Sequence, residues 1–229
     1  MVGMKGTVVL SASVVLVLLL AAPSYAGILL LAGADWQMNE TEGQMIDSSG
    51  NNNNGSPTDV LQTGSKYVFN GSTSRVAVPD NDSLDPLEKD ITLRASVMVP
   101  DAPMDDDSYD VVRKGLAGRP GGQYKMEIKR AAADPTVGKL NCLFQGSGGT
   151  VNKVSRRDIV DGNWHTLECI KTADSVVVRV DGRNGSTKAG SAGSISNPTN
   201  VLVGAKTASP LDDTFDGTMN HVSIRIGQR

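Results

Sequence analysis

Asp161-Gly162-Asn163-Trp164-His165 and Val180-Asp181-Gly182 stand at the two ends of the stretch that decides the fold. Turn-forming residues open the stretch, and Leu167 and Cys169 then fall on one face of an alternating run. A valine-rich run, 176–180, follows and closes on the second Asp-Gly turn. Alternation of apolar and polar residues indicates strands, and a short connection between two strands favours antiparallel pairing. The stretch therefore predicts two consecutive, paired β-strands.

The same alternation recurs along the chain, whereas helical periodicity is almost absent. Apolar and polar residues alternate in the further runs 91–99, 124–129, 140–144 and 222–226. Clusters of Gly, Asn, Asp, Ser and Pro separate the runs, as at 48–55, 79–86 and 146–149. Many short strands with such turns and no long helix predict an antiparallel β-sandwich. Neither an internal repeat nor a linker is visible, so we expect one domain, roughly 33–229.

The N-terminus has the pattern of a secretory signal peptide. Lys5 is followed by an almost unbroken apolar run, 8–22, and Ser24 and Ala26 are small residues that suit a signal peptidase. We expect removal of residues 1–26, which leaves 27–229 as the mature, secreted, extracellular chain. A membrane anchor is the alternative, but the apolar run is shorter than the ~20 residues of a span. We therefore expect no membrane insertion of the mature chain.

The net charge and the cysteine content indicate which classes of partner to expect and whether a disulfide forms. The net charge is −3, so no basic excess attracts nucleic acid, and we expect no nucleic-acid partner. We also expect the chain to be a monomer. Cys142 and Cys169 are the only cysteines. In an oxidising compartment such a pair predicts a disulfide, whereas a metal site would need more ligands. Both cysteines share a strand face with core residues, so we expect a bridge between neighbouring strands.

Several segments, in their order along the chain, resemble the laminin-G-like (concanavalin A-like) jelly roll in the form found in secreted bacterial proteins. Besides the opening stretch, they are 34–40, 47–53, 67–71, 91–93, 113–115, 122–126 and 215–222. Each segment is short, but their order is specific for the fold. The resemblance covers nearly the whole expected mature chain and implies an all-β, antiparallel jelly-roll sandwich. It does not identify a ligand, because one fold hosts many functions.

The resemblance also implies where an ion would bind. Several jelly rolls of this class hold a structural calcium near the first turn and the closing strand, where this chain has Asp47 and Asn220. Calcium prefers about 6–8 oxygen ligands, and His221 stands where many relatives have an acid. A calcium ion at Asp47 and Asn220 is one expectation, and a metal-free, hydrogen-bonded turn is the other.

No catalytic constellation is visible. Hydrolases of this fold carry an E-x-D-x-x-E pattern on one strand, whereas Glu88-Lys89-Asp90 is followed by Leu93 at the third position. Glu127 lies between Lys125 and Lys129, so no single strand presents paired carboxylates. We predict that the protein is not an enzyme and assign no catalytic residue.

The histidines and the acidic runs also have structural interpretations. We expect His165 and His221 to make hydrogen bonds within the sandwich. The run 80–85 lacks residues that an EF-hand loop requires. The run 101–110 holds five acids and predicts a solvated loop, with a cation or partner site as the alternative.

Sugar recognition usually uses an exposed aromatic ring together with polar groups for the hydroxyls. We expect Trp36 and Trp164 in the core, which leaves Tyr109 and Tyr124 as candidates and the binding residues unassigned. The prediction is a secreted, non-catalytic module that recognises carbohydrate or glycoconjugate ligands through its loops or its concave sheet. The alternatives are an extracellular protein-binding or adhesion module and, third, a degenerate hydrolase scaffold. An exposed aromatic with polar neighbours on the concave sheet would favour sugar.

Overall fold

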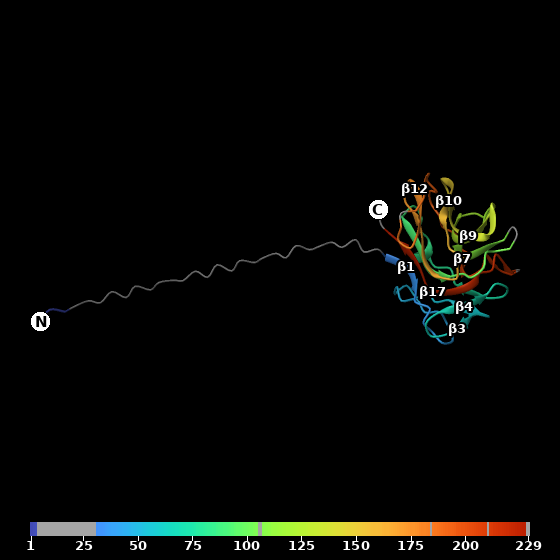
Figure 1. Cartoon of the computed structure of the whole chain (residues 1–229). Coiled ribbons are helices and arrows are strands. Elements are labelled where there is room, and N and C mark those ends of the chain that lie inside the picture. Colours follow the sequence, from blue (N-terminus) through green and yellow to red (C-terminus); the bar gives the residue numbers. More distant parts are fainter. Residues whose placement is uncertain (4–30, 105–106, 184, 210, 228–229) are drawn as a thin grey trace.

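The structure, a computed structural model, describes residues 1–3, 31–104, 107–183, 185–209 and 211–227. Apart from its first three residues, the signal peptide predicted for 1–26 lies outside the described residues and stays a prediction. The described part forms two antiparallel sheets packed face to face (Figure 1). Its one helical turn is the 3-10 turn η1 (Asp82–Leu84), and no helix in this part is long and apolar enough to cross a membrane. The predicted antiparallel sandwich is confirmed.

The first sheet has eight strands and contains both the beginning and the end of the domain. Its order is β13 (Thr187–Ala189), β12 (Ser175–Val180), β11 (Trp164–Lys171), β6 (Ile91–Met98), β17 (Asp216–Ile226), β4 (Tyr67–Asn70) and β3 (Leu61–Gln62), with β1 (Leu31–Trp36) paired to β17. Because Leu31 pairs with Ile226, the chain enters and leaves the domain at neighbouring positions, as Figure 1 shows.

The second sheet has seven strands. Its order is β10 (Gly149–Asp158), β9 (Asp134–Gly146), β8 (Gln123–Ala131), β7 (Ser108–Lys114), β14 (Val201–Val203), β5 (Arg75–Val78) and β2 (Ser56–Thr58). A separate small hairpin, β15 (Thr207–Ala208) with β16 (Leu211–Asp212), lies between β14 and β17 in the sequence.

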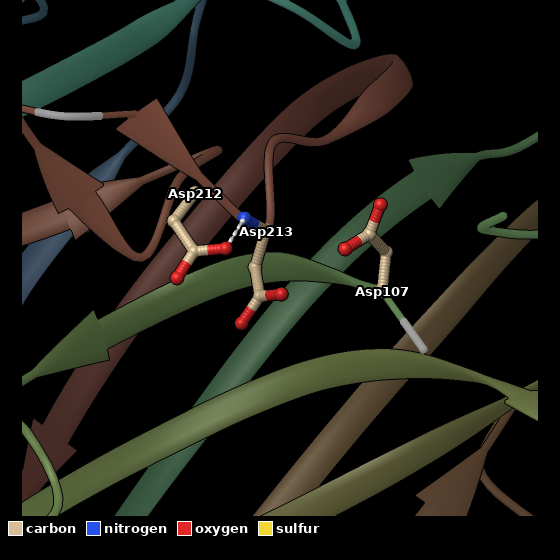
Figure 2. Close-up of side chains that lie close together, drawn as sticks. All are labelled: Asp107, Asp212 and Asp213. Carbon is tan, nitrogen blue, oxygen red and sulfur yellow. Dashed lines mark hydrogen bonds between the residues drawn. The ribbon is translucent and has the colours of Figure 1, made fainter. Parts of the chain in front are cut away.

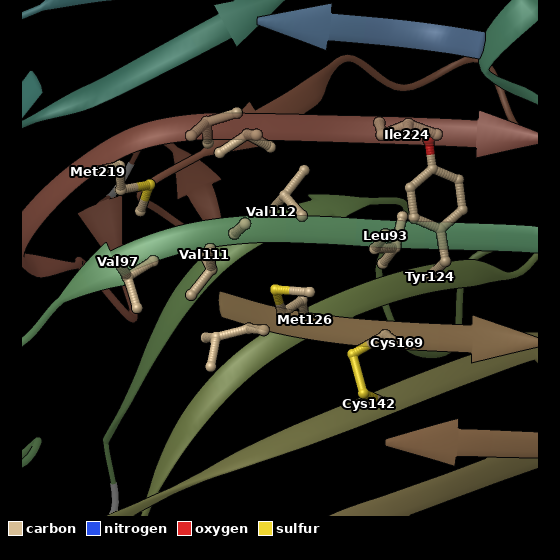
Figure 3. Packing of buried hydrophobic residues seen from close by; sticks show 14 of the residues in the cluster. Leu93, Val97, Val111, Val112, Tyr124, Met126, Cys142, Cys169, Met219 and Ile224 are labelled. Atoms are coloured by element: carbon tan, nitrogen blue, oxygen red, sulfur yellow. A yellow bond between two sulfur atoms is a disulfide. The ribbon is translucent and has the colours of Figure 1, made fainter. Parts of the chain in front are cut away.

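The core lies between the two sheets because alternate residues of each strand point inward. In β6 the inward residues include Leu93 and Val97, and in β8 they include Tyr124 and Met126, all with 0% exposure. Figure 3 shows these side chains meeting between the layers. Burial of such apolar surface is the main favourable contribution to folding.

The stretch that predicted the first strand pair forms β11 and β12, which pair antiparallel from Leu167–Val180 onward. Asp161, His165 and Asp181 of these motifs contact one another at this hairpin. His165 is 3% exposed, and its ring nitrogens lie 2.9 Å from Asp181 Oδ2 and 3.0 Å from Asp161 Oδ1. The Asp181 carboxylate also accepts a hydrogen bond from the Thr166 backbone N–H. The imidazole thus ties the turn before β11 to the end of β12, which is the structural role expected for His165.

The disulfide between Cys142 and Cys169 is present, with a Cα–Cα distance of 5.4 Å. It connects β9 of the seven-stranded sheet to β11 of the eight-stranded sheet, as Figure 3 shows. The expectation of a bridge between neighbouring strands was therefore wrong. Both side chains face inward from opposite layers, and alternation within one strand does not reveal which layer a strand joins.

Candidate functional site

A cluster of buried polar side chains lies on the outer face of β7, β8 and β9. Tyr124, Met126 and Ile128 of β8 face the core, so Lys125 and Glu127 face outward. Outward-facing residues of a two-layer sandwich are normally in contact with water, yet Glu127 has 0% exposure. Burial of a carboxylate is costly unless it is paired, so a buried Glu127 requires hydrogen-bond or charge partners.

Glu127 accepts hydrogen bonds from three neighbouring strand residues. Asn141 Nδ2 donates to Oε1 at 2.6 Å, and Ser108 Oγ donates to Oε2 at 3.0 Å. Lys125 Nζ donates to Oε2, and Lys129 Nζ lies 3.3 Å from Oε1. Burial alone would raise the pKa of Glu127, but the charge and hydrogen bond of Lys125, with the Asn141 hydrogen bond, lower it overall. Glu127 is therefore a charged anchor to which two lysines bind.

Asp110 lies directly opposite Glu127 in the β7–β8 pairing. Its side chain has 0% exposure, and Arg113 Nη1 donates to its Oδ2 at 2.6 Å. Burial raises the pKa of Asp110 to about 7, although Arg113 and Lys125 act in the opposite direction. Within the described residues, no donor reaches its Oδ1. Asp110 was expected in a solvated loop, and this was wrong because β7 already begins at Ser108.

Above this cluster the surface is hollowed by about 420 Å³. We call this feature the Glu127 hollow; it is lined by Asp107, Ser108, Lys125, Glu127, Lys129, Arg130, Ala132, Lys206 and Asp213. Four of these residues are cationic and three are acidic. The hollow thus offers both hydrogen-bond donors and acceptors, with only one more cationic residue than acidic ones.

Three aspartates from two separate segments lie close together beside the hollow: Asp107 and Asp213 line it, and Asp212 is the neighbour of Asp213. Figure 2 shows Asp212 and Asp213 side by side with Asp107 opposite them. Lys206 Nζ lies 2.7 Å from Asp212 Oδ2 and 3.3 Å from Asp213 Oδ2. These contacts, above all the hydrogen bond to Asp212, raise the pKa of Lys206. A lysine therefore supplies positive charge at this cluster of carboxylates. Asp105 and Asp106 of the same acidic run lie outside the described residues.

The aromatic predictions had mixed outcomes. Trp36 is in the core, as expected, with 0% exposure. Trp164 was expected there too, but it is 40% exposed, because the inward positions of β11 belong to His165, Leu167 and Cys169.

The two tyrosine candidates also differ. Tyr124 is fully buried, with its hydroxyl donating to the Leu84 carbonyl at 3.0 Å, so it is not available to a ligand. Tyr109 packs edge-on against Phe215 and lines a smaller hollow of about 310 Å³. Asp107, Ser108 and Asp213 line both hollows, which places Tyr109 beside the Glu127 hollow.

Asp47 holds the first turn together through hydrogen bonds. Its Oδ1 accepts from the backbone N–H groups of Asp35 and Ser49, each at 2.9 Å. Its Oδ2 accepts from Ser49 Oγ at 2.7 Å and from the Asn53 N–H at 3.0 Å. A carboxylate has about four lone-pair positions, so Asp47 as placed does not fit a calcium ligand.

The other residues considered for the ion lie on the closing strand. A β-bulge between Met219 and His221 leaves Asn220 without a partner residue on β6. Among the described residues no hydrogen bond joins Asn220 to Asp47. His221 Nε2 lies 3.1 Å from Asp35 Oδ1, so this histidine makes the structural contact that was expected. The calcium ion stays a prediction, and these contacts favour its alternative, the hydrogen-bonded turn.

Sequence reasoning missed the pairing of Asp110 with Glu127 because the two residues belong to different strands. Each strand alone shows a single outward acid among cations. Only the register of β7 on β8, which includes a bulge between Asp110 and Val112, places one carboxylate opposite the other. The contribution of Lys206 and Asp213 was missed for the same reason, since they approach from a segment remote in sequence.

Comparison with protein families gives one match. A family model of the laminin G type, described as the concanavalin A-like lectin/glucanases superfamily, matches residues 70–225. No curated protein sequence matches the chain.

Solved structures are similar at low sequence identity. The binding domain of Paraclostridial Mosquitocidal Protein 1 is 15% identical, with a TM-score of 0.65, and the match covers 86% of this chain and 49% of that one. Mouse laminin alpha1 chain domains LG4-5 are 13% identical, with a TM-score of 0.55, and the match covers 71% of this chain and 42% of that one. The third structure is domain 4 of AbnA, a GH43 extracellular arabinanase from Geobacillus stearothermophilus, solved in complex with arabinotriose. It is 15% identical, with a TM-score of 0.59, and the match covers 86% of this chain and 92% of that one. The chain spans less than half the length of the first two structures, and these similarities show the fold alone.

Proposed function

Because the chain belongs to the concanavalin A-like lectin/glucanases superfamily, in its laminin-G-like form, we propose that it is a non-catalytic binding module for carbohydrate. The Glu127 hollow is the proposed site. The module is further proposed to be exported through the signal peptide at 1–26 and to act outside the cell as a monomer. The Cys142–Cys169 disulfide supports an oxidising compartment.

The observation that carries this proposal is the fixed polar lining of the Glu127 hollow. Glu127 holds Lys125 and Lys129 over the sheet, while Asn141 and Ser108 satisfy its remaining acceptor positions. Polar groups held in place before binding lose little conformational entropy when they bind a ligand. Donors and acceptors placed in this way suit the hydroxyl groups of a sugar.

A related fold supports the ligand class. Domain 4 of AbnA was solved in complex with arabinotriose, and the match covers 92% of that domain. A neutral oligosaccharide is therefore the first ligand to test on this chain.

The proposal includes the absence of catalysis, because two carboxylates of this site are buried and cannot reach a substrate. Asp110 and Glu127 are the carboxylates that lie opposite each other on β7 and β8, and both have 0% exposure. An acid and a base for glycoside hydrolysis must reach the bond that breaks. Asp110 is held by Arg113, and Glu127 by its lysines, so both serve to position other groups.

A second candidate function, docking of another exported protein, is favoured by a different surface. On the outer face of the eight-stranded sheet, one row of paired residues runs across five strands: Leu61, Val68, Thr218, Met98 and Trp164. Leu61 is 63% exposed and Trp164 is 40% exposed. Aromatic residues are enriched at protein interfaces, so this row is the surface for the alternative.

The test is titration of the purified chain with soluble neutral polysaccharides, arabinan among them, in calcium and again in chelator. We expect saturable binding to one class, weakened about tenfold in the double variant Lys129→Gln and Asp107→Asn. Both side chains line the hollow and are exposed, so the fold should be retained.

The matched control is Arg94→Gln with Glu42→Gln, which makes the same charge changes away from the hollow and should bind like the wild type. Binding that is equal in both double variants would place the site elsewhere. No binding to any polysaccharide would favour the protein-docking alternative.

A further inference from the structure

A third hollow, of about 440 Å³, lies between the edges of the two sheets, where β10 faces β12. Figure 1 shows these strands side by side. On β10 the inward-facing row begins with Val151, which is 6% exposed and belongs to the core, and continues with Lys153 and Ser155. Because the row changes from apolar to polar, the space between the layers opens to water here. Val178 and Val180 of β12 form its apolar wall.

An irregularity in β10 directs two arginines into this space. The register of β10 on β9 shifts between Val154 and Asp158. In a regular strand Arg156 and Arg157 would point to opposite faces, but both line the hollow. A β-bulge of this kind re-aims side chains, often beside binding sites.

The opposite wall follows the turn after β12. Arg183 lines the hollow, and its backbone N–H donates to the Val180 carbonyl at 3.2 Å. Gly185 then packs so closely on β12 that a Cβ would lie 1.1 Å from the Val178 carbonyl oxygen. Glycine at this position lets the turn lie against the strand, and the turn holds Arg183 at the hollow.

The four cationic residues Lys153, Arg156, Arg157 and Arg183 therefore meet in one hollow, which we call the basic groove. Among its described lining residues there is no carboxylate. Arg157 is paired outside the lining, with Nη1 2.6 Å from Asp181 Oδ2. The whole chain has a net charge of −3, so this concentration of positive charge is local.

Charged residues on an edge strand can also serve to prevent aggregation. That function explains cations on β10, but it does not explain Arg183, which comes from the other sheet and faces the same space. A cleft lined by one sign of charge focuses the field and attracts ions of the opposite sign. Arginine forks match the planar or tetrahedral oxygens of carboxylate, sulfate and phosphate groups.

We propose that the basic groove binds the anionic groups, sulfate or carboxylate, of an acidic polysaccharide. The groove lies between strand edges, where an extended chain can pass along it. No aromatic residue is among its described lining, so it lacks the stacking surface on which single-stranded nucleic acids depend. This inference rests on the proposed function for the ligand class, but it concerns a separate site and a different sugar chemistry.

The experiment measures binding of the purified chain to dextran sulfate, polygalacturonate and neutral dextran. We expect one or both anionic polymers to bind, and affinity to fall roughly ten- to fiftyfold between ~50 and ~200 mM salt. Sulfate and carboxylate are distinguished by which polymer binds more tightly. Neutral dextran that binds as well as the charged polymers, or no binding of either charged polymer, would overturn the proposal.

Matched variants locate the site. Arg156→Gln with Arg183→Gln should weaken binding about ten- to hundredfold, because charge-assisted hydrogen bonds are lost. The control Arg94→Gln with Arg225→Gln removes the same charge from two side chains of the eight-stranded sheet that are 44% exposed and do not line the groove, and it should change affinity less than about twofold.

Equal melting temperatures would show that both double variants fold. An equal loss of affinity in both double variants would mean that only net charge matters, and it would overturn the proposed site. Binding of a single-stranded DNA oligonucleotide more tightly than either acidic polymer would also overturn the proposal. The Lys129→Gln and Asp107→Asn variant should bind the acidic polymer normally, so failure of the Glu127 hollow leaves this result unaffected.

Discussion

The Glu127 hollow and the basic groove each contain four cationic side chains, but only the first contains acids to match them. The hollow lies on the face of a sheet, where alternation along β8 places Glu127 between two lysines and the strand register places it opposite Asp110. The groove lies at strand edges, where the register of β10 on β9 shifts. Charges on the sheet face are therefore neutralised by their neighbours, whereas in the groove, among the described residues, only Arg157 has a carboxylate partner, Asp181.

The largest expected effect comes from removing the central acid of the hollow. Glu127→Ala leaves Asn141, Ser108 and Lys125 without their common acceptor in a buried environment. Breaking a buried charge pair in this way should lower the free energy of unfolding by about 3–5 kcal/mol, measured by urea denaturation.

Two substitutions sharpen that result. Glu127→Gln keeps the shape and some hydrogen bonds and should cost less than Glu127→Ala. Glu42→Ala, on an exposed acid, should stay within about 0.5 kcal/mol of the wild type. If Glu127→Ala lowers the free energy of unfolding no more than Glu42→Ala does, the hollow is not held together by its charges.

The next effect concerns the pH dependence of the same cluster. The folded-state pKa of Asp110 is raised to about 7, above that of an unfolded aspartate at about 4. The folded state therefore binds the extra proton between these values, and the contribution of Asp110 to stability falls as the pH rises through this range. Asp110→Asn removes the titration, so its melting temperature relative to the wild type should rise from pH 5 to pH 8. A difference that does not vary with pH would contradict the account of Asp110.

A smaller effect of opposite sign is expected in the basic groove. Its cations repel one another, so Arg156→Gln with Arg183→Gln should raise stability in low salt by about 0.3–0.5 kcal/mol. The gain should disappear near ~0.5 M salt, because salt screens exposed charges. Melting temperatures at the two salt concentrations measure it. A loss of stability in low salt would mean that these arginines are paired, as in the hollow, and would remove the contrast between the regions.

The smallest expected effect is at the first turn. The four hydrogen bonds to Asp47 occupy its oxygens, so chelator should leave the melting temperature unchanged. A melting temperature lowered by chelator and restored by calcium would instead establish the ion first considered at Asp47 and Asn220.

The sequence predicted the buried face of each strand better than the sites, and Trp164 shows why. Alternation places Trp164 outside once Leu167 and Cys169 are inside, and this local rule held. The expectation of a buried tryptophan came from the resemblance of the motif, and the structure contradicts it. Pattern within one strand is a local property that sequence carries directly.

The sites depend on contacts between strands, which the sequence does not carry in the same way. Asp110 meets Glu127 through a register with a bulge, and Cys142 meets Cys169 across two layers. Arg156 and Arg183 meet only where two sheet edges come together. In each case the residue types were visible in the sequence, and the partner was fixed by tertiary structure.

The pairing of Leu31 with Ile226 has a mechanical consequence. A pulling force applied to the chain at these two positions loads the first rung of the β1–β17 ladder alone, so the rungs break one after another, as in a zipper. Such loading requires far less force than sliding the same strands past each other. Peeling would then stop short of residues 142–169, because the disulfide keeps that segment from extending and continues to hold β9 to β11. If the domain is tethered at both ends, its first response to tension is therefore the release of β1, while β9 and β11 stay bonded to each other.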